Sequence, residues 1–205
     1  MRVVVFISGR GSNLQALRER QENYTISHVI CNHAQAAGLQ IARDFDIPST
    51  VIPWRDTDQA EAQALALLRE INPDLIVLAG FMRVLSAGFV ANFQFKIINI
   101  HPSLLPLYPG LNTHQRALND RQSKHGATVH YVDQHLDQGH SISQCHINIT
   151  AKDTAETLAA RLLSKEHKLL TTTVNKIASG EIYWQDNQLF YNNQVITQPI
   201  VWSNI

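Results

Sequence analysis

Residues 2–13 read RVVVFISGRGSN, an unbroken apolar run followed by a turn that contains two glycines. An apolar run of this length is typical of a strand that is buried on both faces of a parallel sheet. In residues 13–21, Leu14 and Leu17 stand three apart, which predicts a helix with Ser12 as its cap. A strand, a glycine turn and a helix in this order predict the opening unit of an α/β fold.

Strand-like and helix-like patterns continue to alternate through residue 150. The expected strands are residues 2–7, 25–31, 49–52, 74–79, 95–100, 127–132 and 141–150. The expected helices are residues 13–21, 34–45, 59–71, 86–92, 113–120 and 153–179. This order predicts an open, mostly parallel twisted sheet flanked by helices, with an antiparallel C-terminal part.

The C-terminal part carries two further signals. Asp153 and Glu156 have the spacing of a capping box at the start of the long helix, and Thr154 is the alternative cap. Apolar pairs at residues 183–184 and 189–191 flank Asp186 and Asn187, which predicts a small hairpin. The tail beyond Gln194 gives no clear pattern.

The composition restricts the class of protein. The 205 residues are 44% hydrophobic, and 17 basic residues balance 17 acidic ones, so no basic field exists for a nucleic-acid backbone. The apolar runs are too short to span a membrane, and no signal peptide pattern opens the chain. Two cysteines provide no disulfide framework. We therefore expect a cytoplasmic globular protein of one domain that binds no membrane, and the composition leaves a monomer and a homodimer both open.

The turn after the first strand is the first candidate site. Gly11, Ser12 and Asn13 stand at a helix start, where free N–H groups and the helix dipole favour an anion. A dinucleotide fingerprint needs a third glycine where Leu14 stands, and an acid at the end of the second strand, where residues 31–33 have none. A small phosphate and a turn without a ligand are about equally favoured by this spacing.

Asn99 and His101 form the second candidate site. They stand two apart at the end of an expected strand, so their side chains face the same way. An amide and an imidazole together offer two donors for a carbonyl oxygen that becomes an oxyanion. The alternative is a histidine that only caps the turn at Pro102.

Two acidic residues complete the set of candidates. Asp137 precedes Gly139 in what is ordinary turn chemistry, but a carboxylate that faced His101 would raise the pKa of the imidazole. Glu166 lies on the apolar stripe of the long helix between Leu162 and Leu169. It must therefore be paired, lean to the edge of the stripe, or line a pocket for an amine.

Ten histidines suggest a metal site, but their spacing does not. Four of them recur every five residues, which matches neither a helix face nor one side of a strand. No paired Cys or His motif accompanies them, so we expect no metal.

Four stretches together resemble the phosphoribosylglycinamide formyltransferase family, within the folate-dependent formyltransferase superfamily. They are ISGRGSNL at 7–14, LAGFMRVL at 78–85, INIHPSLLP at 98–106, and HGATVH at 125–130 followed by LDQG at 136–139. The third stretch is shared across the superfamily, and the first indicates this branch. The resemblance covers the chain from Val3 to about Ile182 and implies a Rossmann-like formyltransferase fold.

The resemblance also implies a reaction, in which the amine of glycinamide ribonucleotide attacks the formyl carbon of 10-formyltetrahydrofolate in purine synthesis. Asn99 and His101 would hold the formyl oxygen, and Asp137 would support His101 and help to move the proton. The remaining implied contacts are Gly11, Ser12 and Asn13 to the phosphate, Glu166 to the glycinamide end, and Met82, Arg83, Val84, Leu85, Asn99 and Asp137 to the folate. The single domain would then comprise a phosphate-binding half (1–100), a catalytic and folate-binding half (101–182) and a tail (183–205).

Three departures from the family pattern affect the expected folate contacts. Thr57 stands where many members have an arginine, with Arg55 two residues away. Residues 138–140 read QGH instead of Gly-Gly-Pro, and Leu107 replaces a frequent lysine. The alternatives that the residues leave open are a formyltetrahydrofolate hydrolase, a formyltransferase for another amine, a nucleotide-binding dehydrogenase and a binding protein without catalysis.

Overall fold

The computed structural model describes residues 1–202 and divides into two compact units, Met1–Asn99 and a second unit that begins at Ile100. The boundary between the two units lies next to residue 100, which is the predicted end of the first half of the chain. The grouping of both halves into one domain stays a prediction.

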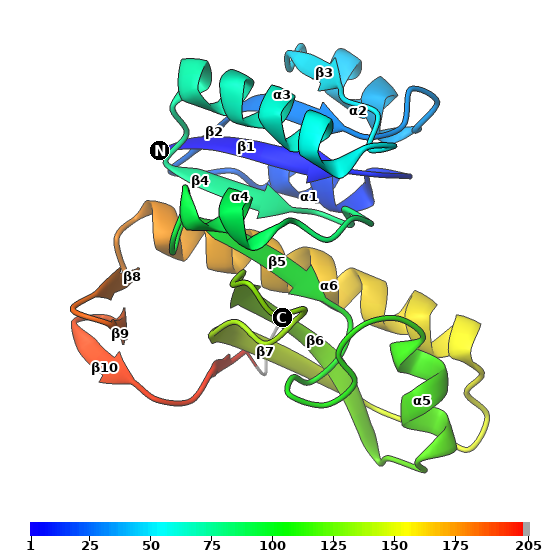
Figure 1. Ribbon diagram of the computed structural model, residues 1–205. Helices are drawn as coiled ribbons and strands as arrows, with labels where there is room; N and C mark the ends of the chain where they lie inside the picture. Colours follow the sequence, from blue (N-terminus) through cyan, green and yellow to red (C-terminus); the bar gives the residue numbers. More distant parts are fainter. Residues whose placement is uncertain (203–205) are drawn as a thin grey trace. The chain divides into compact units, whose positions relative to one another are not determined.

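A five-stranded parallel sheet forms the first unit (Figure 1). Its spatial order is β3-β2-β1-β4-β5, and every pair within it is parallel. The strands are β1 (Arg2–Ile7), β2 (Thr25–Cys31), β3 (Ser49–Val51), β4 (Leu75–Leu78) and β5 (Ile97–His101). The unbroken apolar run of β1 is fully buried because it lies at the centre of this sheet.

Helices join these parallel strands in sequence. They are α1 (Ser12–Glu19), α2 (Gly38–Asp44), α3 (Thr57–Ile71) and α4 (Ala87–Ala91). Because the strand order reverses at β1, α1 and α2 cover one face of the sheet and α3 and α4 the other (Figure 1). The expected α/β class with a mostly parallel sheet is confirmed. The expected helix at 34–45 begins only at Gly38, since turns occupy the residues before it.

The turn between β1 and α1 depends on two glycines. Gly11 has a φ of 79°, and a Cβ atom on it would lie 2.5 Å from the Cα atom of Gly38. The N–H of Gly38 donates to the carbonyl of Gly9 at 3.0 Å. The expectation that Ser12 caps α1 is wrong, because Gly11 is the cap and Ser12 is already the first helical residue.

The second unit is built around the antiparallel pair β6 (Lys124–Tyr131) and β7 (Ser141–Asn148). The short strand β11 (Ile200–Val201) adds to β7 in parallel. The helix α5 (Thr113–Asn119) precedes β6, and α6 (Ala155–Ala178) packs on β6 and β7. Four leucines of the predicted apolar stripe of α6 are fully buried: Leu158, Leu162, Leu169 and Leu170.

Thr154 caps α6. Its hydroxyl accepts from the N–H of Thr157, whose hydroxyl accepts from the N–H of Thr154 in return. The expected capping box of Asp153 and Glu156 is therefore wrong, and the alternative cap is right. Asp153 instead pairs with Arg161 at 2.5 Å.

The predicted hairpin is confirmed. It joins β8 (Ile182–Gln185) to β9 (Gln188–Tyr191), and β10 (Gln194–Ile196) extends it to three antiparallel strands. Asp186 and Asn187 both have positive φ values, as a two-residue hairpin turn requires. Among the helices of residues 1–202, none is long and apolar enough to cross a lipid bilayer.

Candidate active site

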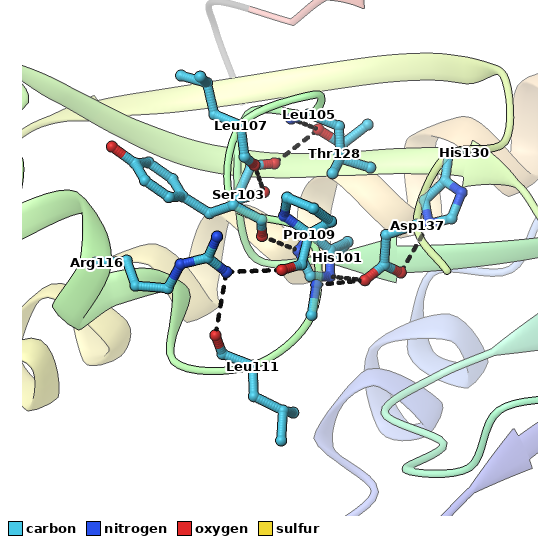
Figure 2. A network of polar contacts seen from close by, with 12 residues as sticks. His101, Ser103, Leu105, Leu107, Pro109, Leu111, Arg116, Thr128, His130 and Asp137 are labelled. Atoms are coloured by element: carbon cyan, nitrogen blue, oxygen red, sulfur yellow. Dashed lines mark hydrogen bonds and ion pairs between the residues drawn. The ribbon is translucent and has the colours of Figure 1, made fainter. Parts of the chain in front are cut away.

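His101 and Asp137 face each other in the second unit, as the sequence analysis required of a catalytic pair (Figure 2). Nδ1 of His101 lies 3.3 Å from Oδ2 of Asp137, and the two side chains are only 7% and 8% exposed. Nε2 of the same ring donates to the backbone carbonyl of Tyr108 at 2.9 Å. Both ring nitrogens therefore face acceptors, and only an imidazole that carries two protons satisfies both.

Burial opposes that charged form of His101. It lowers the pKa of the imidazole below its ordinary value, while the Tyr108 carbonyl and the Asp137 carboxylate raise it and offset part of the effect. The sequence analysis expected Asp137 to raise the pKa, and its contribution has that direction. The net effect is a His101 pKa below its ordinary value, because burial has the largest influence.

Asp137 is held by more than His101. Its Oδ2 accepts from the N–H of Gly110 at 2.9 Å, and its Oδ1 lies 3.6 Å from Nε2 of His130. Burial alone would raise the pKa of this carboxyl, but the contacts with His130, Gly110 and His101 outweigh it and keep the pKa below its ordinary value. Asp137 has a φ of 53°, a left-handed conformation that a non-glycine residue adopts at an energetic cost.

The sequence pattern predicted that His130 lies in a strand but did not indicate it as a site residue. His130 lies in β6, is 2% exposed, and shares its Nδ1 with the carbonyl of Tyr131 at 2.8 Å. This leaves Nε2 facing Asp137. The available signal was the motif HGATVH, but only the fold of the loop before β7 brings Asp137 to this histidine.

A cavity of about 360 Å³ adjoins the carboxylate. It is lined by Leu105, Pro106, Pro109, Asp137, Gln138, Gly139 and Ser141. Its wall is mostly apolar with a few polar groups, which is typical of a small-molecule site. The loop that begins at Asp137, which was expected to contact the folate, therefore lines a cavity.

The expected phosphate turn lies in the first unit, at the N-terminus of α1. Ser12 and Asn13 are half-buried, and the first backbone bond of the helix, from Gln15 to Gly11, leaves the N–H groups of residues 12–14 outside the helical ladder. Within residues 1–202, Oδ1 of Asn13 is a buried atom without a hydrogen-bond partner. The open N–H groups at this helix start can bind an anion.

The expected folate segment Met82, Arg83, Val84 and Leu85 follows β4, which pairs with β1. The N–H of Met82 donates to Oγ of Ser8 at 2.8 Å, so this segment and the glycine turn lie side by side. Met82 and Val84 are 68% and 64% exposed. Exposed apolar side chains beside the glycine turn offer a surface to an apolar ligand group.

Two more of the expected site residues, Asn99 and Glu166, lie on β5 and α6. Asn99 lies in β5 beside Leu78 of β4, two residues before His101. Glu166 is half-buried on α6 and is not among the residues that line the cavity. Its charge contributes to a raised pKa of Cys145, which burial brings to about 11, so it lies on the side of α6 near β7.

Two further histidines, the buried His125 and the half-buried His114, form a pair beside the site. Nε2 of His125 and Nδ1 of His114 are 3.0 Å apart, and His125 is 1% exposed. Burial is the largest cause that lowers the pKa of His125 to about 4, and a bond to the carbonyl of Pro102 opposes it. Among residues 1–202, no group of three or more His, Cys, Asp or Glu side chains could hold a metal ion.

Residues 1–174 match the formyl transferase family. The chain is 38% identical to phosphoribosylglycinamide formyltransferase of Escherichia coli over 201 residues, which is 95% of each protein. It is 39% identical to part of the human trifunctional purine biosynthetic protein adenosine-3, covering 91% of this chain and 19% of that protein. Its structure is similar to that of phosphoribosylglycinamide formyltransferase from Coxiella burnetii in complex with CHES, with a TM-score of 0.91, 39% identity, and coverage of 98% and 99% of the two chains.

The His125 pKa predicts how stability depends on pH. The imidazole is neutral in the folded chain above about pH 4, whereas in the unfolded chain it takes up a proton near its ordinary pKa of 6.5. The unfolded state then binds more protons between these values, so stability falls as pH falls, by up to about 3 kcal/mol.

Urea denaturation of wild type and His125→Asn from pH 7 to 4 measures this effect. The asparagine keeps a donor for the Pro102 carbonyl but does not titrate, so the variant should lose less stability than wild type over this range. His135→Asn, at an exposed histidine, serves as the control with an unchanged slope. Equal slopes for wild type and His125→Asn would contradict the assignment.

Proposed function

The chain belongs to the formyl transferase family, and we propose that it is a phosphoribosylglycinamide formyltransferase. It transfers the formyl group of 10-formyltetrahydrofolate, as cosubstrate, to the amine of glycinamide ribonucleotide in purine synthesis. The observation that carries the proposal is the near full-length similarity to such enzymes in a chain where His101 and Asp137 form a buried pair and Asp137 lines a cavity. A cytoplasmic location and the absence of nucleic-acid partners stay predictions.

The chemistry needs two donors at the formyl oxygen. The neutral amine attacks the formyl carbon, and the oxygen becomes negatively charged in the tetrahedral intermediate. Asn99 and His101, two residues apart in β5, would donate to this oxygen. Because Nε2 of His101 is engaged by Tyr108, Nδ1 is the nitrogen that would share its proton between Asp137 and the oxyanion.

Asp137 balances the charges of this step. The attacking nitrogen becomes positive and must lose a proton, which Asp137 or a water that it holds would accept. The carboxylate also favours the protonated ring of His101, which burial disfavours. The intermediate then collapses, the bond to the folate nitrogen breaks, and a proton delivered through His101 leaves tetrahydrofolate and the formylated amine.

The ligand contacts extend the proposal to other residues. Gly11, Ser12 and Asn13 would hold the substrate phosphate, and Glu166 would contact the glycinamide end. Met82, Arg83, Val84 and Leu85 and the Asp137 loop would contact the folate. The open N–H groups of α1 and the exposed apolar side chains at residues 82–84 support these roles.

A spectrophotometric assay with each component omitted in turn tests the activity. We expect folate product only when both glycinamide ribonucleotide and the 10-formyl folate are present. Folate release without the ribonucleotide would indicate a hydrolase instead. Release with other amines but not with glycinamide ribonucleotide would indicate another acceptor.

Substitution of the pair tests the mechanism. His101→Ala should lower kcat by about 100-fold or more with little change in KM, because it removes a donor to the oxyanion. Asp137→Asn should lower kcat and move the alkaline limb of the pH–rate profile to lower pH, since the charge that favours protonated His101 is lost. A wild-type pH profile in Asp137→Asn would exclude this role for the carboxylate.

Substitution of the turn tests the phosphate site. Ser12→Ala and Asn13→Ala should raise the KM for glycinamide ribonucleotide about 10-fold while the KM for the folate and kcat change little. Gln15→Ala, at an exposed residue of the same helix, is the matched control. An effect confined to the folate KM would contradict the phosphate assignment.

A further inference from the structure

The loop at residues 108–111 contacts both members of the catalytic pair through its backbone. The Tyr108 carbonyl accepts from Nε2 of His101, and the Gly110 N–H donates to Asp137. Any shift of this loop would move the partner of each catalytic side chain. The positions of His101 and Asp137 therefore depend on what holds the loop from its other side.

Arg116 of α5 holds the loop from that side. Its Nη1 donates to the carbonyl of Pro109 at 2.6 Å and reaches the carbonyl of Leu111 at 3.4 Å. Its guanidinium carbon lies 5.2 Å from the centre of the Tyr108 ring, which is a cation–π distance. One planar side chain thus contacts three residues of the loop, Tyr108, Pro109 and Leu111, as Figure 2 shows for its bonds to the two carbonyls.

The loop needs such support because its backbone is strained. Tyr108 has a φ of 57°, in the left-handed region that bulky side chains rarely adopt. Residues in such conformations persist only where surrounding contacts enforce them. The hydroxyl of Tyr108 adds one contact by donating to Asp120 at 2.9 Å, also near α5.

We propose that Arg116 is a positioning residue for the formyl transfer, which holds the strained 108–111 backbone so that the Tyr108 carbonyl and the Gly110 N–H orient His101 and Asp137. The proposal rests on the proposed function for its kinetic consequences and on the loop contacts alone for its structural ones. Lysine does not reproduce these contacts, because an ammonium group lacks the planar face that stacks on the Tyr108 ring while Nη1 donates to the two carbonyls.

The charge of Arg116 has a separate effect. It lies near enough to His101 to lower the pKa of that imidazole, although burial has the larger influence. The other charged or titratable groups that face His101 are Asp137 from its own loop, His130 and His125 from β6, and His114 from α5. A neutral replacement of Arg116 therefore changes both position and charge, whereas lysine changes position alone.

The test compares Arg116→Lys and Arg116→Gln with wild type, and with Arg121→Gln as the control, which removes an exposed positive charge just after the same helix. We expect kcat to fall about 10-fold in both Arg116 variants with KM changed less than about 2-fold. The alkaline limb of the pH–rate profile should shift to higher pH in Arg116→Gln only, because the charge that lowers the His101 pKa is lost. Arg121→Gln should match wild type in both measurements.

A second measurement is independent of turnover. In ¹⁵N-labelled protein, the Nε2 proton that His101 shares with Tyr108 should exchange slowly with water in wild type and Arg121→Gln, and at least about 10-fold faster in both Arg116 variants. Tyr108→Phe, which removes only the bond to Asp120, should show a smaller change in the same direction. Thermal midpoints identify any variant that fails to fold.

The outcomes separate this inference from the proposed function. Wild-type protein without formyl transfer would overturn the proposed function, while the exchange of the His101 proton would still decide whether Arg116 positions the ring. Unchanged exchange and unchanged kcat in the folded Arg116 variants would overturn the inference. A pH shift in Arg116→Gln with full kcat in Arg116→Lys would overturn it too, because it would leave Arg116 only an electrostatic effect.

Discussion

The arrangement of the candidate active site depends on the carboxylate of Asp137. It is 8% exposed and accepts the Gly110 N–H while it faces His101 and His130. Its loss would leave an amide and two imidazoles without their acceptor, which costs free energy at a buried position. These contacts also outweigh the cost of its left-handed backbone. A strained residue held by several partners provides a fixed charge beside the cavity.

The first unit follows a different constraint, the close approach of two backbones. Gly11 and Gly38 are too near for a side chain on either, because a Cβ on Gly38 would lie 2.6 Å from a side-chain carbon of Ile7 and 3.0 Å from Gly11. This contact sets where α1 begins and leaves its first N–H groups open. The parallel sheet then brings the segments after β1 and β4 to the same edge, where Met82 bonds Ser8.

Local patterns predicted most elements because strand and helix periods are local properties. The strand at 2–7, the strand at 25–31 and the hairpin around Asp186 all follow such patterns. The caps were harder, since several neighbouring residues offer the same chemistry. Ser12 was expected as a cap, but the approach of Gly38 makes Gly11 the last residue outside the helix. At α6 the choice between Asp153 and Thr154 depended on Arg161, which pairs with Asp153.

The sequence was enough to predict the fold class, the position of Asn99 and His101 along one strand, and the family that the motifs indicate. These properties depend on residue type and on periods of two to four residues. The contacts of Asp137 with His101 and His130, and those of Arg116 with the loop behind them, depend on the tertiary structure. It also reversed the net direction of the His101 pKa, because burial depends on segments that lie far apart in the chain. Spacing shows which side chains share a face, and folding decides how much water reaches them.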